Sequence, residues 1–311
     1  MISRREFVAG VLLSPLARAM ANPRPQGVLI ESHIHLFSDD PAHFPYAADA
    51  PYRPPAYPLS QFVSFAHEAM IEHAVIVHPE PYQDDHRYLE YCLAHEPSKG
   101  FFKGTCLFDP IDPKTPARMA ALAKRNPGRI VALRIHEVHL AGTPPPTSGP
   151  IRDRDLRHPQ MLETWRAAHE LGFAIQMHFI PHYATQIGEL GAKFPDMPII
   201  LDHLARGGEG TPAEYDDVLA LAKLPRVYMK FTTTGVRSFT KQPYPYLEAK
   251  PMVKRAYEAF GADRMIWGTL GNGMEGFDQA SRMLDVMFDY APETARAKIR
   301  GLNSKKLYGF A

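Results

Sequence analysis

Short apolar runs alternate with amphipathic segments along most of this chain. The runs are rich in β-branched and aromatic residues and are bounded by Pro, Gly or polar residues, which is typical of strands. They cover residues 28–33, 74–78, 102–107, 130–135, 173–178, 199–202, 227–231 and 265–267. Segments with helical spacing follow them at 60–72, 84–95, 116–126, 160–171, 184–194, 212–223, 251–260 and 277–290. Nearly continuous apolar strands indicate a parallel sheet covered on both faces, and this strand–helix rhythm predicts a single-domain (β/α)8 TIM barrel of the α/β class.

Several helix starts carry their own signals. Ser60, Asp84 and Thr115 are residue types that cap helix amides, and Pro116 and Pro212 suit the first helical turn. An open, doubly wound sheet is the alternative architecture. We disfavour it because the glycine-rich phosphate turn that usually follows its first strand is missing from this sequence.

Three connections are longer than a barrel needs. Residues 38–58, 141–157 and 232–250 follow the first, fourth and seventh strands, so we expect them at the carboxyl end of the barrel, where this fold builds active sites. They are rich in Pro, Tyr and Phe, as in Phe44-Pro45-Tyr46. Because proline restricts its own backbone angle and that of the preceding residue, these segments are expected to wall a pocket.

Composition and charge narrow the range of partners. The 311 residues include 35 Lys and Arg against 34 Asp and Glu, so no overall charge attracts nucleic acid or anionic lipid. A small-molecule substrate is the expected partner, and the sequence leaves the oligomeric state unknown. Cys92 and Cys106 lack metal-type spacing and are interpreted as buried free thiols, with a bridge as the alternative in an exported protein.

The first residues resemble a twin-arginine export signal. Ser3-Arg4-Arg5-Glu6-Phe7-Val8 precedes an apolar stretch that ends at Leu16, and Ala19-Met20-Ala21 has the pattern of a cleavage site. An amphipathic first helix is the alternative, and Pro15 argues against it. We therefore expect residues 1–21 to be removed and residues 22–311 to form the barrel in the periplasm of a bacterium. The apolar stretch is too short for a permanent membrane anchor.

Histidines stand at the ends of several predicted strands. His33 and His35 are two residues apart, so strand alternation places both on one face, here the barrel interior. His178 and His203 end the fifth and sixth strands, and a barrel directs all four towards one central point. Such a cluster is suited to metal binding or to polarising a carbonyl group. Three further histidines follow strands, and the sequence does not decide whether they line the site: His78, His136 and His139. We assign five others to the surface or to packing: His67, His73, His95, His158 and His169.

The motifs together resemble the amidohydrolase superfamily, in its amidohydrolase-related branch of 2-pyrone-4,6-dicarboxylate lactonase and sugar lactonases. The resemblance runs from Glu31 to Leu307. It rests on Ser32-His33-Ile34-His35-Leu36-Phe37, Phe44-Pro45-Tyr46, Ala132-Leu133-Arg134, Leu201-Asp202-His203-Leu204-Ala205-Arg206, Trp267-Gly268-Thr269 and Asn303-Ser304-Lys305-Lys306-Leu307-Tyr308. It implies a hydrolase on the barrel already predicted.

The resemblance also implies a ligand set and a base. In metal-dependent relatives the positions of His33, His35 and His178, with an aspartate after the eighth strand, hold a divalent ion such as zinc or manganese. In metal-independent lactonases the same aspartate activates water while the histidines polarise the carbonyl. This chain has Leu270 at the aspartate position, and leucine can neither accept a proton nor bind a metal. Glu31 stands where the family has an acid two residues before the first histidine.

Either another carboxylate replaces the missing aspartate, or the protein is catalytically impaired, or the position was changed deliberately. Glu137, directly after the fourth strand, is the leading candidate for a catalytic role beside His33, His35, His178 and His203. Glu275 lies in a glycine-rich loop after the eighth strand and is assigned with Tyr46 to substrate binding. Glu80 and Asp278 are further options.

Two arginines resemble the substrate-carboxylate contacts of the lactonases. Arg134 and Arg206 carry forked guanidinium groups that can hold a carboxylate through two hydrogen bonds. A salt bridge at the barrel rim, from Arg206 to Glu209 or Glu31, is the alternative. The register of Lys230, inward or outward, stays open.

The sequence thus predicts an exported hydrolase that opens a lactone or related cyclic carbonyl compound, one bearing a carboxylate or hydroxyl groups. Histidines would polarise the carbonyl, with or without a metal ion, and a carboxylate would activate water. The alternatives are a metal-dependent decarboxylase of the same superfamily and a non-catalytic ligand-binding protein that keeps the pocket without the base.

Overall fold

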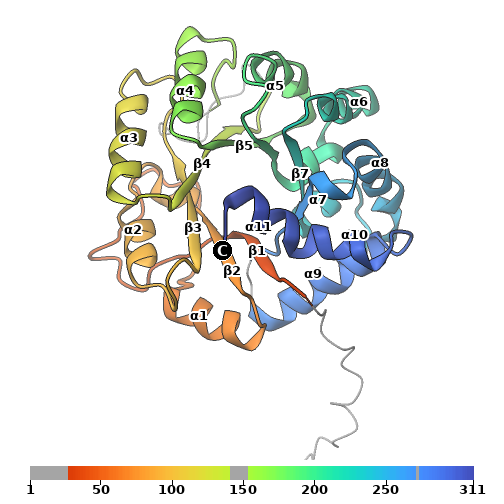
Figure 1. Cartoon of the computed structure of the whole chain (residues 1–311), viewed down its shortest axis with the longest axis horizontal. Coiled ribbons are helices and arrows are strands. Elements are labelled where there is room, and N and C mark those ends of the chain that lie inside the picture. The colour runs from red at the N-terminus through yellow and green to blue at the C-terminus, as the bar shows by residue number, and fades with distance from the viewer. Residues whose placement is uncertain (1–26, 141–152, 271–272) are drawn as a thin grey trace, which may run out of the picture.

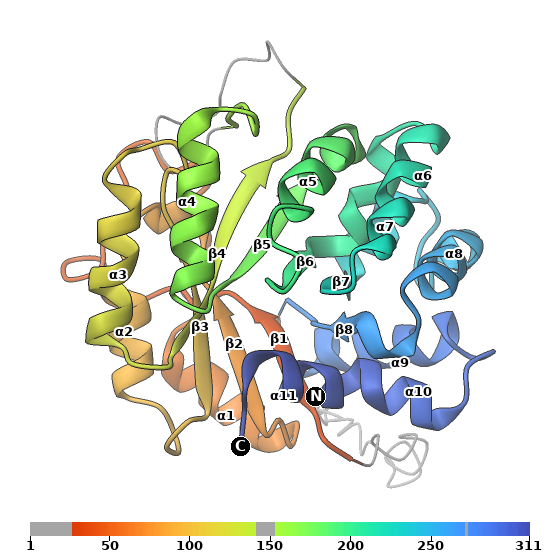
Figure 2. The ribbon, with the colours of Figure 1, turned by 45° about the horizontal axis from the view of Figure 1, so that its top comes forward.

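The computed structural model describes residues 27–140, 153–270 and 273–311. Within these residues the strands form one parallel sheet of eight, hydrogen-bonded in sequence order. They are β1 (Ile30–Ile34), β2 (His73–Val77), β3 (Phe102–Leu107), β4 (Ile130–Glu137), β5 (Ala174–Phe179), β6 (Ile199–Leu201), β7 (Val227–Phe231) and β8 (Met265–Trp267). The sheet curls until β8, labelled in Figure 2, contacts β1. This confirms the predicted TIM barrel.

Side chains and loop backbone join β1 to β8. The Ser32 hydroxyl donates to the Trp267 carbonyl at 2.5 Å, and the Leu270 amide donates to the His33 carbonyl at 3.1 Å. Lys230 of β7 also binds β1, donating from its Nζ to the Ser32 carbonyl at 3.2 Å. The strand that carries the first two histidines is thus tied to the segment that carries Leu270.

Helices follow the strands and form the outer ring (Figures 1 and 2). They are α1 (Leu59–Glu68), α2 (Arg87–Ala94), α3 (Thr115–Arg125), α4 (Pro159–Glu170), α5 (Ala184–Gly191), α6 (Pro212–Ala220), α7 (Thr233–Ser238), α8 (Lys250–Phe260), α9 (Gly273–Met287), α10 (Glu293–Ala297) and α11 (Asn303–Tyr308). Each predicted helix is present. The sequence pattern did not predict the short helices α7, α10 and α11.

The predicted caps at three helix starts are wrong. The residues at the cap positions of α1, α2 and α3 are Pro58, His86 and Lys114, and none of them caps through its side chain. A full capping box occurs instead at α6, where Thr211 and Glu214 satisfy each other's backbone amides. Capping depends on where the backbone leaves its extended conformation, and the residue type alone did not fix that position.

The barrel interior is apolar at its amino end. Inward side chains of successive strands pack there as a closed floor, formed by Ile30, Val75, Val77, Ala132, Ala174, Ile200 and Ile266. Tyr308 and Phe310 of the C-terminal segment pack against this floor. The larger core lies between the strands and the helical ring and buries Trp165 and Trp267 completely. Because apolar side chains fill the amino end of the barrel, we expect the polar side chains that carry chemistry at its carboxyl end.

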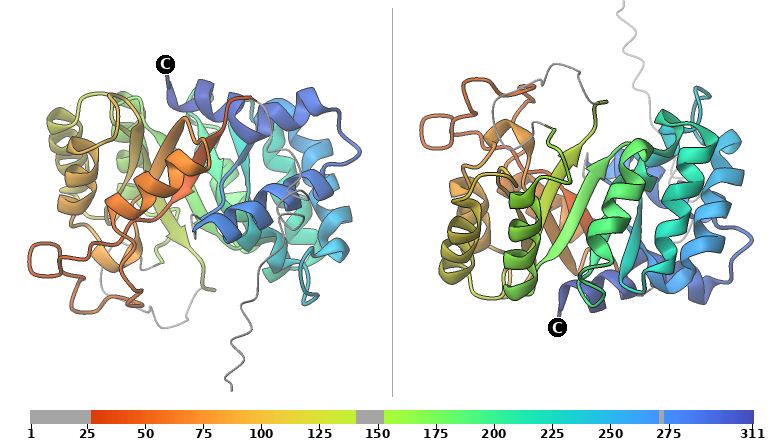
Figure 3. Two further views of the ribbon diagram at one scale, coloured as in Figure 1. Left: turned by 90° about the horizontal axis from the view of Figure 1, so that it is seen from below. Right: turned by 90° about the horizontal axis from the view of Figure 1, so that it is seen from above.

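Residues 38–58 project at the carboxyl end, on the opposite side of the barrel from the C-terminus (Figure 3). The Phe37 amide donates to the Tyr57 carbonyl at 3.0 Å, and the reverse bond is 2.9 Å, so the segment leaves and returns at one point. Of the other long connections, 232–250 contains α7, whereas residues 141–152 and the predicted signal at 1–21 lie outside the described residues.

Two predictions about the whole chain can be compared with the structure. Cys92 and Cys106 are both buried and free, as interpreted from the sequence. Among the described helices, none is long and apolar enough to cross a membrane.

Candidate active site

Strand alternation places polar side chains directly above the apolar floor. On β4, Arg134 and His136 lie on the same face as Ala132, and on β5, Gln176 and His178 lie on the face of Ala174. A register shift in β1, between Glu31 and Ile34, interrupts its alternation just before His35. The inward side chains of several strands therefore meet at the carboxyl end of the barrel.

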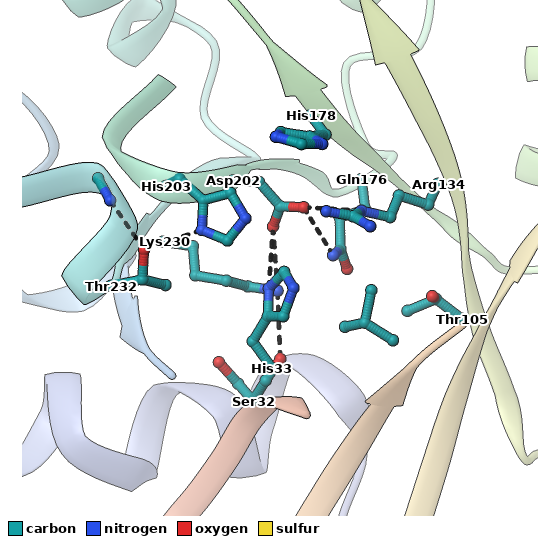
Figure 4. Close-up of polar contacts among 12 residues, drawn as sticks. Ser32, His33, Thr105, Arg134, Gln176, His178, Asp202, His203, Lys230 and Thr232 are labelled. Atoms are coloured by element: carbon teal, nitrogen blue, oxygen red, sulfur yellow. Dashed lines mark hydrogen bonds and ion pairs between the residues drawn. The ribbon is translucent and has the colours of Figure 1, made fainter. Parts of the chain in front are cut away.

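Asp202 is the hub of this polar layer (Figure 4). Its Oδ2 accepts from Arg134 Nε at 3.1 Å and from Gln176 Nε2 at 3.0 Å, and its Oδ1 lies 3.2 Å from Lys230 Nζ and 3.6 Å from His33 Nδ1. Asp202 and Lys230 are fully buried, so Lys230 points inward and its register is resolved. Four strands are thereby joined to the segment that follows β6.

Charge pairing keeps this buried carboxylate ionised. Burial alone would raise the pKa of Asp202, but Lys230, His33 and Arg134 hold it well below its usual range. Burial lowers the pKa of Lys230, and Asp202 opposes that shift. Removing one partner of such a pair would leave an uncompensated charge in the core.

The four histidines predicted from the sequence do meet. His33 Nε2 and His35 Nε2 are 3.3 Å apart, and the ring centroids of His33 and His178 lie 4.7 and 5.2 Å from that of His203. His136, which the sequence left open, joins them, with its Nδ1 3.2 Å from His178 Nδ1. Burial lowers the pKa of all five imidazoles, to about 3 for His136 and His203. They are therefore neutral at pH 7.

The hydrogen bonds restrict the tautomers of the first pair. His35 Nδ1 lies 2.7 Å from the Val77 carbonyl, which can only accept, so in the neutral ring the Nε2 of His35 carries a lone pair. His33 then has two options. It donates from Nε2 to His35, or it turns an Nδ1 proton towards Asp202 and leaves two bare Nε2 atoms facing each other.

Glu80 supplies a carboxylate to the same group of histidines. It lies in a 3-10 turn just after β2, and its Oε1 is 3.0 Å from Arg134 Nη1, 3.8 Å from His136 Nε2 and 3.9 Å from His178 Nδ1. Burial works to raise the pKa of Glu80, but Arg134 and the three nearby histidines lower it well below its usual range. The sequence had placed Glu80 among its secondary options.

Glu31 positions the first histidine from behind. Its buried carboxyl group accepts from the His33 amide at 2.9 Å, from the Thr269 amide at 3.0 Å and from the Thr269 hydroxyl. Burial raises the pKa of Glu31 to about 7, although these hydrogen bonds oppose the shift. Gly268 is required beside them, because a Cβ there would lie 2.7 Å from His33 Cβ.

An unusual backbone conformation carries His203 and Arg206. Residues 203–206 all have φ between 49° and 56°, a left-handed turn that non-glycine residues rarely adopt. His203 is held by Thr232, whose hydroxyl lies 2.8 Å from its Nδ1. Arg206 forms a bidentate pair with Glu209 at 2.7 and 2.6 Å, while its Nη1 is 3.4 Å from His178 Nε2. The rim salt bridge considered from the sequence therefore exists, beside the histidines.

Glu137 does not join the histidines. It follows the inward-facing His136 on β4 and therefore faces outward. Its partner in register is Phe179, which packs in the core between the barrel and the helices. Its carboxyl oxygens accept from the Arg154 amide at 3.1 and 3.2 Å, and burial raises its pKa to about 9. A catalytic role for Glu137 is untested, and the geometry gives it no contact with the cluster.

The remaining candidates lie further out. Tyr46 packs against Phe37 and Tyr82 and donates to the Pro54 carbonyl at 3.2 Å, so it supports the wall formed by residues 38–58. Glu275 is exposed in the first turn of α9. His78 stacks on His86 on the outer side of β2, and His139 pairs with Asp153.

Sequence reasoning missed several members of the site. Asp202 and Gln176 were not singled out, although each stands two residues from an inward position, Ile200 or His178. Extending the alternation rule from the histidines to their strand neighbours would have found both. Glu80 carries no such signal because it lies in a turn.

Two groups of side chains have the spacing of metal ligands. They are His33, Asp202 and His203, and Glu80, His136 and His178. The 3.3 Å between the Nε2 atoms of His33 and His35 also matches the roughly 3.3 Å expected for two ligands about 2.0–2.1 Å from a tetrahedral ion. Leu270 adds no ligand, however, and the cations Arg134 and Lys230 lie alongside. The donor set fits a divalent ion through imidazoles and lacks the carboxylate expected at 270.

Comparison with known proteins agrees with the fold. The 4-sulfomuconolactone hydrolase of Rhizobium radiobacter is 28% identical over 290 residues, which cover 90% of this chain and 89% of that protein. A probable 2-pyrone-4,6-dicarboxylic acid hydrolase of Acinetobacter baumannii, solved with citric acid bound, superposes with a TM-score of 0.72 at 17% identity over 91% of this chain and 100% of that one. A dihydroxybenzoic acid decarboxylase of Polaromonas sp. JS666, solved with manganese, gives 0.62 at 15% over 91% and 97%. The family model for amidohydrolases matches residues 30–310, and the chain belongs to the amidohydrolase family.

Proposed function

We propose that the protein is a hydrolase that opens a lactone or a related cyclic carbonyl compound. The observation that carries the proposal is the group of largely buried imidazoles beside the carboxylates of Asp202 and Glu80 at the carboxyl end of the barrel. The likeness to 4-sulfomuconolactone hydrolase along 90% of the chain supports a lactone over other carbonyl substrates.

His33 and His203 are proposed to polarise the substrate carbonyl, because the one proton of a neutral His35 ring is already bonded to the Val77 carbonyl. A neutral imidazole N–H directed at the carbonyl oxygen stabilises the negative charge that develops there during attack, and a buried site strengthens this interaction. Asp202 and Glu31 hold His33, and Thr232 holds His203, so the donors are in place before substrate binds. Little reorganisation is then needed in the transition state.

Glu80 and His178 are proposed to activate water in place of an acid at 270. The neutral His178 would take the proton, and the Glu80 carboxylate, 3.9 Å from its Nδ1, would stabilise the imidazolium that forms. Contacts of this kind are often long before substrate binds. Arg206, 3.4 Å from Nε2 of the same ring, orients it from the other side.

A divalent ion, if the protein binds one, would be held by imidazoles. His33 and His35 offer the facing Nε2 atoms, with Asp202 and the Val77 carbonyl behind their Nδ1 atoms, as outer partners of metal-bound histidines usually stand. Such an ion would polarise the carbonyl as a Lewis acid. Because position 270 gives no anionic ligand, we propose substoichiometric binding of zinc or manganese, which elemental analysis of protein purified without added metal tests.

A panel of lactones tests the proposed function. Ring opening releases a proton, so a pH indicator reports turnover of aldono-, pyrone- and aryl-fused lactones by the full chain. We expect hydrolysis of at least one class, reduced by about 10²-fold or more in His178→Asn, since general acid–base groups contribute on this scale. Absence of turnover across the panel, with and without zinc or manganese, would contradict the proposal and favour a binding protein.

A further inference from the structure

A cavity of about 520 Å³ opens beside His35. Its walls come from the end of β1, the projecting 38–58 segment, α1 and the residues around Leu270. Aromatic rings and prolines form most of the lining, among them Phe37, Tyr52, Tyr57, Pro54 and Pro55. The volume lies in the range of small-molecule sites, and His35 brings the histidine cluster to its wall.

Among the described residues that line this cavity, none carries a carboxylate, an ammonium or a guanidinium group. The polar groups are His35, Gln61 and the tyrosine hydroxyls, and the Tyr52 hydroxyl donates to Glu80 Oε2 at 2.5 Å. Leu270 lines the cavity where relatives carry an acid, with φ of 72°. The change at 270 therefore does more than remove a base, because it makes this wall apolar.

The cations near the histidines already have anionic partners. Arg134 contacts Asp202 and Glu80, Arg206 contacts Glu209, and Lys230 contacts Asp202. Arg53, next to the lining residue Pro54, directs its guanidinium to the carbonyls of Ala47 and Ala48 at 3.0 and 3.1 Å. A substrate carboxylate would have to displace one of these partners.

The neighbouring Glu80 adds a further cost for an anion. Its Oε1 lies 3.0 Å from Arg134 Nη1 and its Oε2 accepts from the Tyr52 hydroxyl, so a carboxylate stands next to this wall of the cavity. A carboxylate in the cavity would lose hydration without gaining a cation. An uncharged ring would instead bury apolar surface against aromatic walls, which stabilises by roughly 25 cal/mol per Å².

We propose that the cavity is the subsite for an uncharged, apolar ring of the substrate, so that the substrate is a neutral aryl- or alkyl-substituted lactone. This inference rests on the proposed lactone hydrolysis. It replaces the carboxylate-bearing substrate expected from the resemblance of Arg134 and Arg206 to lactonase residues. The lactone carbonyl would face the histidine cluster behind His35 while the ring fills the cavity towards Leu270.

Binding of two unreactive bicyclic compounds tests the subsite without turnover. Isothermal titration of the full chain with 2-naphthol and with 2-naphthoate compares a neutral and an anionic ring of one shape. We expect 2-naphthol to bind at least about tenfold more tightly, a difference of about 1.4 kcal/mol. Leu270→Asp should weaken 2-naphthol by a similar factor, whereas Leu270→Met should leave it within about threefold.

A second variant keeps the test valid if Leu270→Asp does not fold. Gln61 is an exposed residue of α1 that also lines the cavity, so Gln61→Lys adds a cation there and Gln61→Met adds none. We expect Gln61→Lys to tighten 2-naphthoate by about tenfold and Gln61→Met not to. Equal or tighter binding of 2-naphthoate by the wild type, or binding that neither position affects, would overturn the proposal.

Turnover separates this inference from the proposed function. With dihydrocoumarin and the same ring bearing a carboxylate, we expect kcat/KM to favour the neutral lactone by at least about tenfold. Hydrolysis that favours the anionic lactone, and that Arg53→Ala abolishes, would overturn the inference and leave the proposed function standing. No hydrolysis of either, with selective 2-naphthol binding, would contradict the function and leave the apolar subsite standing.

Discussion

Individual residues around His33 show how tightly the first strand is specified. Three residues constrain His33. Glu31 accepts from its backbone amide, Asp202 lies near its Nδ1, and Gly268 leaves room for its Cβ. The side chains supply orientation and charge, while glycine supplies space. A change at any of the three should therefore displace His33.

Gly268→Ala should disturb the site most directly. The added Cβ would lie 2.7 Å from His33 Cβ and 3.0 Å from its amide nitrogen, so the histidine strand must shift. We expect a loss of about 1–3 kcal/mol in the free energy of unfolding, as for other overpacked positions, and a fall in kcat/KM. Urea unfolding and the lactone assay measure both, and a variant with wild-type stability and activity would contradict the account.

Glu137 should reveal itself through pH-dependent stability. Its pKa is raised by burial to about 9 in the folded chain from an ordinary value of 4.5, so the folded state retains a proton that the unfolded state loses. Its contribution to stability therefore falls as pH rises from about 4.5 to about 9, by up to about 1.4 kcal/mol per pH unit. Glu137→Gln should flatten the decline in unfolding free energy between pH 5 and pH 9. An unchanged slope would show that Glu137 is ionised in the folded chain.

At the scale of elements, the sequence predicted the strands closely and the carboxyl-end details less well. β3, β7 and β8 begin and end where the apolar runs do, because a strand that is buried on both faces has apolar residues at nearly every position. Helix α7 was not predicted, since its six residues, Thr233–Ser238, have no apolar periodicity. Tertiary packing specifies it instead, against the left-handed turn at residues 203–206.

Glycines make that packing possible, and Gly235→Ala tests it. A Cβ at Gly235 would lie 2.5 Å from the carbonyl carbon and oxygen of His203, which are backbone atoms that cannot rotate away. We expect a loss of about 1–3 kcal/mol in unfolding free energy. Gly188→Ala in α5 is the matched control, because its Cβ meets only a Leu221 methyl group at 3.1 Å and alanine favours a helix by up to about 1 kcal/mol. Equal effects of the two substitutions would contradict the packing argument.

For the molecule as a whole, the barrel predicted from the sequence explains why the histidines meet. The ion pairs around them could not be predicted from the sequence. Strand ends converge in any such barrel, so His33, His35, His178 and His203 could be placed together before the structure. The pairing of Arg134 with Glu80 and Asp202 depends on side-chain directions in three separate segments. No local pattern records such a contact.

Export is a property of the whole chain and remains a proposal. Arg4 and Arg5 lie outside the described residues, and their sequence context resembles a twin-arginine signal. In a bacterial host we expect the wild-type protein in the periplasmic fraction, shortened at its N-terminus, and the double variant Arg4→Lys with Arg5→Lys in the cytoplasm. Immunoblotting of the cell fractions measures this. Finding the double variant in the periplasm would argue against export by the twin-arginine route.

We propose that Glu80 and His178 together activate water in this protein, which has Leu270 where the family resemblance implies an aspartate. The most direct test is kcat for lactone hydrolysis by Glu80→Gln beside Glu137→Gln, the same change at a glutamate that contacts the histidines and at a buried one that does not. We predict that Glu80→Gln lowers kcat by about 10²-fold or more with little change in KM, while Glu137→Gln stays within about twofold of wild type. Wild-type kcat in a folded Glu80→Gln variant, or a larger loss in Glu137→Gln, would contradict the account.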